Sequence, residues 1–431
     1  MISITKVLSV WEKFSAIRSS FASMVRVLPR ERNVVSLILS TALLLINCSA
    51  SAQDAVRVVR LDGQTIEGSL DGIDATGIIS GSGLNADLRL NDIASLAKMQ
   101  SAQQQNDRTA FIVRLVGGGV VRSNDVTLEN DRFQVVTAAG TLVVGAESIQ
   151  AIIFNKFMDN ATLSQALNEP DGTQDRVIVA TSSGDQVVPG LLKSFSDSKI
   201  EIEFRGRIRS ITVSNNVIGL IMANLKQELP AGTRVRAVAT DGSTFVGAFR
   251  GLESNKLKLD LVGSRPVELD WQKINRIYIQ SDRVLYLSDL QPVAVEEQAL
   301  GTTLFNWQAD RNVYSQPLSL YDPEKGDFDE YDRGLGTHSF CRLEYEITGG
   351  GYTNFLASVG LDRLSRHRGD CEVAVVVDGI EVWTRRVRGN EAPHQVDIEL
   401  SNARKLALVV RPGEHLDLGD HVNWVDARLL K

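Results

Sequence analysis

Aromatic and imidazole side chains are missing from a long stretch of this 431-residue chain. No Trp, Tyr, His or Cys occurs between residues 53 and 270, whereas all Tyr lie at or beyond Tyr278 and all His at or beyond His338. Acid–base and nucleophilic catalysis depend largely on these side chains. We therefore predict a spacer or docking role for the first stretch and recognition for the last third of the chain.

A basic surface is also missing. The chain has 46 Lys and Arg against 53 Asp and Glu, a net charge of −7, which argues against a nucleic-acid partner because phosphate binding needs a basic face. Pro is rare and 43% of the residues are hydrophobic, so the chain is globular rather than disordered. Motifs of metalloproteases, serine hydrolases, P-loops and dinucleotide sites are lacking, and we predict that the protein is not an enzyme.

The longest apolar run without a charge, Val34–Ile46, is shorter than the roughly 20 residues that span a bilayer. Two arginines precede it and the small residues Ala50–Ala52 follow it, which is the pattern of a secretory signal peptide. We interpret residues 1–52 as a cleaved leader, with Met24 as the true start. The mature protein is then exported, periplasmic or extracellular, and has no membrane span.

Two cysteines remain after removal of this leader, Cys341 and Cys371. Both alternate with apolar residues, so both thiols are expected to point into a core. An even number of cysteines in an exported protein permits one disulfide. Two separate buried thiols are the alternative.

A repeat of about 45 residues runs through residues 55–281. Each copy has an apolar strand, a Gly turn, further alternating strands and a closing pair of apolar residues three positions apart. The turn glycine precedes the closing pair by 30, 31, 33 and 32 residues in the four copies. The turn glycines are Gly63, Gly118, Gly184 and Gly242, and the closing pairs are Ile93 and Leu96, Ile149 and Ile152, Val217 and Leu220, and Ile274 and Ile277.

This register predicts four small antiparallel β units over residues 53–99, 108–156, 175–226 and 231–281, with a linker at 157–174 that contains a short helix. The pattern resembles Sm-like and SH3-like half-barrels. Protein partners are the expected ligands of such units, and the fold class of the whole chain is predicted to be all-β.

Residues 284–431 contain several short alternating runs joined by turns, which indicates a β-sandwich. This region resembles the NPCBM family of carbohydrate-binding domains. The resemblance implies a jelly-roll fold of the galactose-binding type and a galactose-like sugar as partner, although the family often has Asp where Asn423 stands. The residues that carry it are Gly334–Ser339, Leu343–Tyr345, Tyr352–Phe355, Val359–Asp362, Val373–Gly379, Leu406–Leu408 and Asp420–Ala427.

Sugar binding needs an aromatic ring for the apolar face of the sugar and planar polar groups for its hydroxyls. Our predicted ligand-binding residues are Trp307, His338, Asp420 and His421. For His338 the alternative is a role in capping a strand, and Trp383 and Trp424 are interpreted as core residues. Further candidates outside the strands are Tyr314, Arg366, His367 and His415.

The segment Asp322–Asp332 is acidic, and Asp327, Asp329 and Asp332 offer the hard oxygen ligands that Ca²⁺ prefers. Their spacing is not that of an EF-hand, and we favour a solvated acidic loop. No other cofactor is expected.

Three hypotheses follow. The first is an exported, non-catalytic glycan-binding protein whose β units space or dock the C-terminal sandwich. The second is a structural or protein-interaction protein of the cell envelope that binds no sugar. The third is an unrecognised hydrolase, because the two carboxylates of a glycosidase leave no sequence motif.

Overall fold

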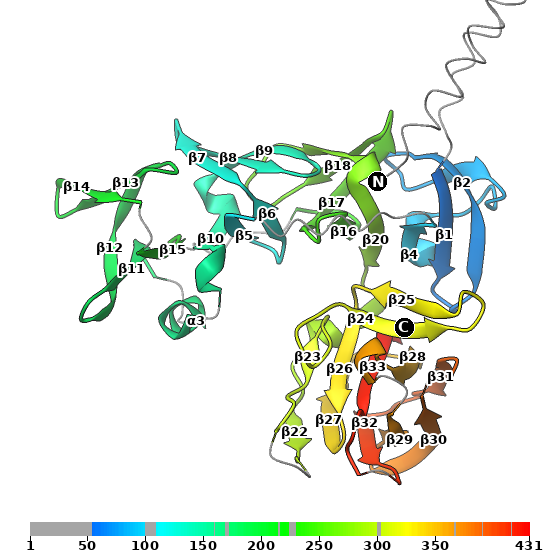
Figure 1. Ribbon diagram of the computed structural model, residues 1–431. Coiled ribbons are helices and arrows are strands. Elements are labelled where there is room, and N and C mark those ends of the chain that lie inside the picture. The colour runs from blue at the N-terminus through cyan, green and yellow to red at the C-terminus, as the bar shows by residue number, and fades with distance from the viewer. Residues whose placement is uncertain are drawn as a thin grey trace, which may run out of the picture. The chain divides into compact units, whose positions relative to one another are not determined.

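The computed structural model describes residues 54–99, 109–158, 160–168, 172–213, 216–223, 230–299, 303–365, 368–389, 391–414 and 416–431 (Figure 1). The predicted leader with Met24, and the candidates Arg366, His367 and His415, lie outside the described residues. The all-β prediction is confirmed, because α3 (Ala161–Asn168) is the only α-helix in the described part of the chain. Residues Asp54–Lys431 form one compact unit.

The first half of the described chain folds as four successive groups of antiparallel strands, which we call units 1 to 4. Unit 1 contains β1 (Asp54–Arg60), β2 (Thr65–Ile73), β3 (Ile79–Ser82) and β4 (Ile93–Lys98). Unit 2 contains β5 (Phe111–Leu115), β6 (Val120–Ser123), β7 (Asp125–Glu129), β8 (Arg132–Thr137), β9 (Gly140–Gly145) and β10 (Ile149–Phe154).

Units 3 and 4 have five strands each. Unit 3 contains β11 (Asp175–Thr181), β12 (Gly184–Phe195), β13 (Lys199–Phe204), β14 (Arg207–Thr212) and β15 (Val217–Ile221). Unit 4 contains β16 (Arg234–Ala239), β17 (Thr244–Glu253), β18 (Lys256–Asp260), β19 (Val267–Asp270) and β20 (Ile274–Gln280). In both units the strand order is therefore last, first, second, third, fourth, with each strand antiparallel to its neighbours.

The closing apolar pairs lie at the start of the last strand of each unit and are buried. Their second members also join units to each other. Leu96 of β4 lies opposite Ile277 of β20, and Ile152 of β10 lies opposite Leu220 of β15. The constant spacing in the sequence therefore reflects a buried strand that each unit shares with another one.

Glycine in the second strand allows two strands to approach closely. A Cβ added to Gly190 or Gly247 would lie 2.5 Å or 2.6 Å from the carbonyl oxygen of Glu203 or Asp260 in the neighbouring strand. Both glycines precede a β-bulge in the same strand, which bends it. The buried apolar residues of the four units belong to one hydrophobic cluster, which runs from Val56 in unit 1 to Ile279 in unit 4.

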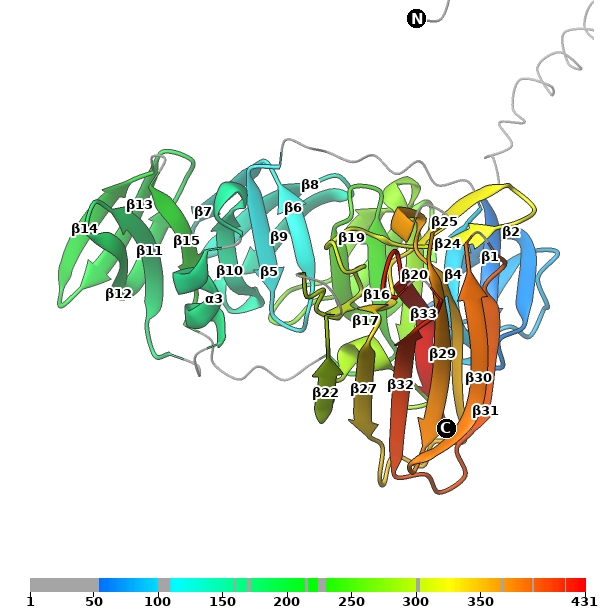
Figure 2. The ribbon, with the colours of Figure 1, turned by 60° about the horizontal axis from the view of Figure 1, so that its bottom comes forward.

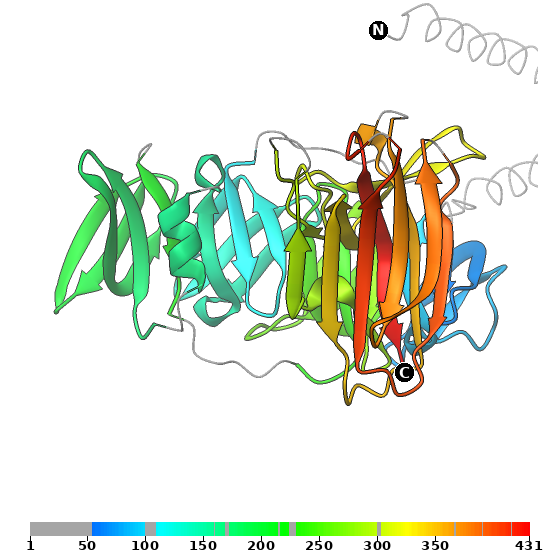
Figure 3. The same ribbon diagram turned by 90° about the horizontal axis from the view of Figure 1, so that it is seen from below.

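The predicted short helix is confirmed as α3. Its N-terminus is capped by Asn160, whose Oδ1 accepts a hydrogen bond from the Leu163 amide at 2.9 Å. Leu163 and Ala166 of the helix pack with Ile153 and Ile218, so α3 covers the strands where units 2 and 3 meet (Figure 3).

The C-terminal region is a sandwich of two antiparallel sheets around one core (Figure 2). The first sheet has the order β23 (Gln308–Ala309), β26 (Gly334–His338), β33 (His421–Leu430), β28 (Asn354–Leu361) and β31 (His394–Glu399), with β21 (Val284–Tyr286) also on β33. The second has the order β22 (Ala294–Glu297), β27 (Cys341–Glu346), β32 (Lys405–Pro412), β29 (Asp370–Val377) and β30 (Ile380–Arg388). A separate hairpin consists of β24 (Leu318–Asp322) and β25 (Asp327–Tyr331).

The core predictions for the sandwich hold, and of the two alternatives left open for the cysteines the structure has the separate thiols. Trp424 is fully buried, and Trp383 is half-buried against the same core. Cys341 and Cys371 are both buried and free. They lie in β27 and β29, which are separated by β32, so their Cα atoms are roughly 10 Å apart, beyond the roughly 7 Å that a disulfide allows. The alternative of two separate thiols is the one observed.

None of the helices in the described part of the chain has the length and apolar character needed to cross a membrane.

Candidate functional site

Two of the predicted site residues, His338 and His421, meet at one end of the first sheet. His338 ends β26 and His421 begins β33, and the antiparallel register places them directly opposite each other. Their ring centroids are 5.0 Å apart, and the side chains are almost fully buried. The sandwich therefore brings together two residues that are 83 positions apart in the sequence.

Two further rings complete an aromatic cluster of Phe305, Tyr314, His338 and His421. The Phe305 ring lies 4.8 Å from His338 and 5.3 Å from His421, and the Tyr314 ring lies 5.1 Å from His421 in an edge-to-face arrangement. Oη of Tyr314 is 3.4 Å from Nε2 of His421, a long hydrogen bond. Tyr314 is 46% exposed, so the cluster presents one ring to solvent.

Both imidazoles are neutral at physiological pH. Burial lowers the pKa of His421 to about 4, with a further contribution from neighbouring His338, and burial also lowers the pKa of His338. Nδ1 of His421 is buried and has no hydrogen-bond partner among the described residues. A neutral imidazole can donate one hydrogen bond and accept another, so it suits an uncharged hydroxylated ligand.

A pocket of about 380 Å³ lies beside the cluster. Aliphatic, aromatic and polar side chains line this pocket, including the guanidinium of Arg368. Its lining includes Tyr314, Gln316, Ser365, Arg368, Leu418 and His421. A pocket of this size with few polar groups and one exposed ring can hold a small polar molecule that has an apolar face.

One buried carboxylate organises the loops around the pocket. Oδ2 of Asp362 accepts hydrogen bonds from Ser319 Oγ at 2.8 Å, from Asn423 Nδ2 at 2.6 Å and from Asn312 Nδ2 at 3.3 Å. Its Oδ1 accepts one from the amide of Leu364, another residue of the pocket wall. Asp362 is 1% exposed, so these bonds replace the water that a buried carboxylate loses.

Asn312 extends this support to the pocket itself. Its Oδ1 accepts hydrogen bonds from the amides of Tyr314 and Gln316, both at 3.0 Å. A single side chain thereby fixes the backbone of two residues in the pocket wall. Sequence reasoning missed Asn312 and Phe305; the only signal for Asn312 is its position two and four residues before the two amides that it binds.

The other two predicted site residues lie apart from the pocket wall. Asp420 is 1% exposed and accepts hydrogen bonds from Ser339 Oγ at 2.8 Å and from the Asp370 amide at 2.9 Å. Burial raises the pKa of Asp420 to about 6, although these hydrogen bonds lower it. Trp307 packs against the core of the sandwich. Both residues support the fold in this structure.

The acidic segment is not the loop that we favoured, because it forms the turn and the second strand, β25, of the β24–β25 hairpin. Nζ of Lys325 lies 3.2 Å from Asp322 and 2.6 Å from Asp329, so a cation of the chain itself neutralises these carboxylates. Across the described ranges, no group of three or more His, Cys, Asp or Glu side chains is arranged to hold a metal ion.

The family comparison matches the same region. The model of the NPCBM/NEW2 domain matches residues 283–430, which include the whole aromatic cluster and the Asp362 network. Residues 283–430 are an NPCBM/NEW2 domain. The resemblance seen in the sequence is thereby confirmed for this third of the chain, and the NPCBM/NEW2 domain coincides with the β-sandwich. No curated protein matches the chain.

Several solved structures are similar to the chain. A CBM51 module from GH95 of Clostridium perfringens, solved with methyl-galactose, is 26% identical over 34% of this chain and 99% of that chain, with a TM-score of 0.31. CBM51-2 and INT domains of Clostridium perfringens ZmpB, solved with GlcNAc, are 21% identical over 41% of this chain and 36% of that chain, with a TM-score of 0.32.

Tandem CBM51 modules of a family 98 glycoside hydrolase from Streptococcus pneumoniae are 15% identical over 75% of this chain and 88% of that chain, with a TM-score of 0.31. NPCBM/NEW2 is a carbohydrate-binding type of domain, and the match covers residues 283–430.

Proposed function

We propose that this protein binds carbohydrate in the pocket beside His421 and Tyr314. The observation that carries the proposal is the half-exposed Tyr314 ring, which stands edge-to-face with the imidazole of His421 in the wall of the pocket. The Tyr ring offers an apolar surface to a sugar ring. The imidazole, the Gln316 amide and the Arg368 guanidinium offer donors and acceptors to its hydroxyls.

The sugar class is part of the proposal. Similar structures were solved with methyl-galactose and with GlcNAc, so galactosides and N-acetylglucosaminides are the first ligands to test. Burial lowers the pKa of both imidazoles, so His421 and His338 favour uncharged hydroxyl groups, and the positive charge in the pocket wall comes from Arg368. Trp307 and Asp420 then contribute through the fold around the pocket.

The four units act as a spacer or docking scaffold in this proposal, and the protein is exported and non-catalytic. The strand order of units 3 and 4, with the last strand beside the first, supports their resemblance to Sm-like and SH3-like half-barrels. A jelly-roll connection of the galactose-binding type is proposed for the sandwich. The unit boundaries at 53–99, 108–156, 175–226 and 231–281 stay predictions.

A protein-interaction role without sugar binding is the second candidate. It is favoured by large apolar side chains exposed on unit 3, where Leu191 of β12 is 56% exposed and Ile208 of β14 is 63% exposed. Strand β14 pairs only with β13 in the described structure, so its other edge is open for a partner. The two candidates differ in whether the pocket binds a sugar.

The test is glycan-array binding of the chain from residue 53 to 431. We expect signal on galactosides or N-acetylglucosaminides, lost in His421→Ala and in Tyr314→Ala and weakened in His338→Ala. Tyr321→Ala is the matched control, because this Tyr packs on Phe328 in the β24–β25 hairpin and does not line the pocket. An empty array, or equal binding by all variants, overturns the proposal, and release of reducing sugar would revive the hydrolase hypothesis.

A further inference from the structure

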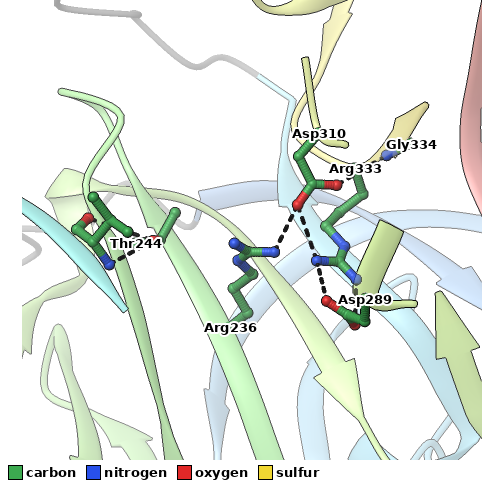
Figure 4. Close-up of polar contacts among 7 residues, drawn as sticks. Arg236, Thr244, Asp289, Asp310, Arg333 and Gly334 are labelled. Carbon is green, nitrogen blue, oxygen red and sulfur yellow. Dashed lines mark hydrogen bonds and ion pairs between the residues drawn. The ribbon is translucent and has the colours of Figure 1, made fainter. Parts of the chain in front are cut away.

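A carboxylate of the C-terminal sandwich is shared between two arginines, one of which belongs to unit 4. Asp310 Oδ2 lies 2.8 Å from Nη1 of Arg236 in β16 and 3.1 Å from Nη1 of Arg333, the residue before β26 (Figure 4). Arg333 also forms a two-pronged ion pair with Asp289 at 2.9 Å and 2.5 Å. A continuous series of ion pairs therefore links unit 4 to the sandwich.

Three of the four side chains in these ion pairs are largely buried, whereas that of Asp289 is 34% exposed. The side chain of Arg333 is 1% exposed, and those of Arg236 and Asp310 are 18% and 21% exposed. Burial alone would lower the pKa of Arg333, but Asp310 and Asp289 raise it, so the guanidinium stays charged. Shielded, charge-assisted hydrogen bonds hold geometry better than exposed ion pairs do.

Asp310 begins the segment that forms one wall of the sugar pocket. Its amide donates to the Gly334 carbonyl at 2.7 Å, and its Oδ1 accepts from the Gly334 amide at 3.1 Å. Two residues later Asn312 fixes the amides of Tyr314 and Gln316. We call residues 310–316 the pocket loop. Hydrogen bonds of Asp310 hold its start, and hydrogen bonds of Asn312 hold its middle.

Unit 4 is itself anchored on the side away from the sandwich. The amide of Val120 in unit 2 donates to Oγ1 of Thr244 in β17 at 3.0 Å, the strand next to the one that carries Arg236 (Figure 4). The backbone of β16 also pairs with β20 along its whole length. Arg236 therefore projects from a strand that is hydrogen-bonded on both sides.

We infer that Arg236 is a positioning residue for the sugar pocket: the β units hold the pocket loop of the sandwich in its binding conformation through the Arg236–Asp310 ion pair. This inference rests on the proposed carbohydrate binding. Without Arg236, Asp310 keeps its ion pair with Arg333 but loses the one to unit 4, so the start of the pocket loop loses one of its restraints. A loop that must be ordered on binding weakens affinity by the free energy of that ordering.

The experiment compares Arg236→Gln with Arg250→Gln in the chain from residue 53. Arg250 is the matched control because it lies in the same unit and pairs with Asp260 at 2.5 Å within that unit. Hydrogen exchange of the pocket loop is measured in both, together with affinity for a galactoside or N-acetylglucosaminide. We expect Arg236→Gln to raise exchange at Tyr314 and Gln316 and to weaken affinity on the order of fivefold.

The outcomes separate the inference from the proposed function. If the parent protein binds sugar and Arg236→Gln leaves both exchange and affinity unchanged, the inference is wrong and the proposed function stands. If the parent binds no sugar, the exchange measurement decides alone: greater exchange in the pocket loop of Arg236→Gln than of Arg250→Gln supports the positioning role, and equal exchange overturns it.

Two further variants keep the test decisive if Arg236→Gln fails to fold. Arg236→Lys retains a charge near Asp310 and should restore part of the protection. Asp310→Asn keeps the shape of the side chain but removes its charge, and combining it with Arg236→Lys should add no further loss of protection. Full additivity of the two substitutions would show that they act independently and would contradict the inference.

Discussion

His338 and His421 face each other across adjacent strands, with their ring centroids 5.0 Å apart beside the candidate pocket. Neither ring can be protonated at neutral pH without placing a buried charge beside the other. Burial, followed by the presence of His338, lowers the pKa of His421 to about 4, well below the ordinary value near 6.5. The pair therefore presents an uncharged hydrogen-bonding surface over most of the physiological range.

Sugar affinity is expected to be constant between about pH 5 and 8, because His421 stays neutral there. Folding stability, in contrast, depends on pH: as the pH falls from about 6.5 to about 4, His421 takes up a proton in the unfolded chain, where its pKa is ordinary, but not in the folded protein. The folded state therefore loses stability relative to the unfolded state over this range. Titration calorimetry at several pH values measures the sugar affinity. An inflection of affinity near pH 6.5 would mean that His421 is exposed to solvent and would contradict the structure.

The contribution of Asp420 to folding stability depends on pH in the opposite direction. Its pKa is raised by burial to about 6, so the folded protein holds the proton more tightly than the unfolded chain does, and this stabilising contribution is lost as the pH rises through about 6. Asp420→Asn removes that titration. Relative to the parent protein, the variant should be more stable at pH 8 than at pH 4.5, by on the order of 1–2 kcal/mol. Urea unfolding at the two pH values checks this, and an equal difference at both would contradict it.

Arg333 should be far more important for stability than an exposed arginine. Arg333→Met leaves Asp310 and Asp289 without their buried cation and is expected to destabilise the fold by about 3–5 kcal/mol. The control is Arg363→Met: this arginine is 42% exposed, against 1% for Arg333, and its ion pair with Glu330 is expected to contribute less than about 1 kcal/mol. Chemical denaturation of both variants gives the comparison, and similar losses would contradict the assigned burial.

The two cysteines should behave as independent buried thiols. Burial raises the pKa of both thiols, so neither should react with a thiol reagent in the native protein. Both should react once the chain from residue 53 is unfolded without a reductant, and a reductant should leave the melting temperature unchanged. Labelling followed by mass measurement tests this; an unfolded chain that stays unlabelled would contain the disulfide that the structure excludes.

Regular spacing and alternation made much of the fold predictable. The closing pairs, such as Ile274 and Ile277, repeat at an almost constant distance from a turn glycine, and that distance follows from the length of the intervening strands. The pairing of Leu96 with Ile277 was not predictable, because no local pattern says which unit a buried strand will meet. For the same reason the sequence could not separate a Cys341–Cys371 disulfide from two thiols, since the intervening strand β32 comes later in the chain.

The candidate site was predictable only in part. His338 and His421 were found because imidazoles are rare and both follow turns, and the structure places them together. Asp420 was chosen for the same position in a loop, but its side chain turns to Ser339 and the Asp370 amide. Phe305 and Arg236 carry no sequence signal of their own, because their roles depend on contacts between segments that are distant in the chain.

The account depends most directly on sugar binding at His421. Isothermal titration of a galactoside and of an N-acetylglucosaminide into the chain from residue 53, beside its His421→Ala variant, tests this. We predict saturable binding of at least one sugar by the parent chain and a loss of about tenfold or more in affinity in the variant, with Tyr321→Ala unchanged. Sugar binding that survives His421→Ala, or no binding by a folded parent chain, would contradict it.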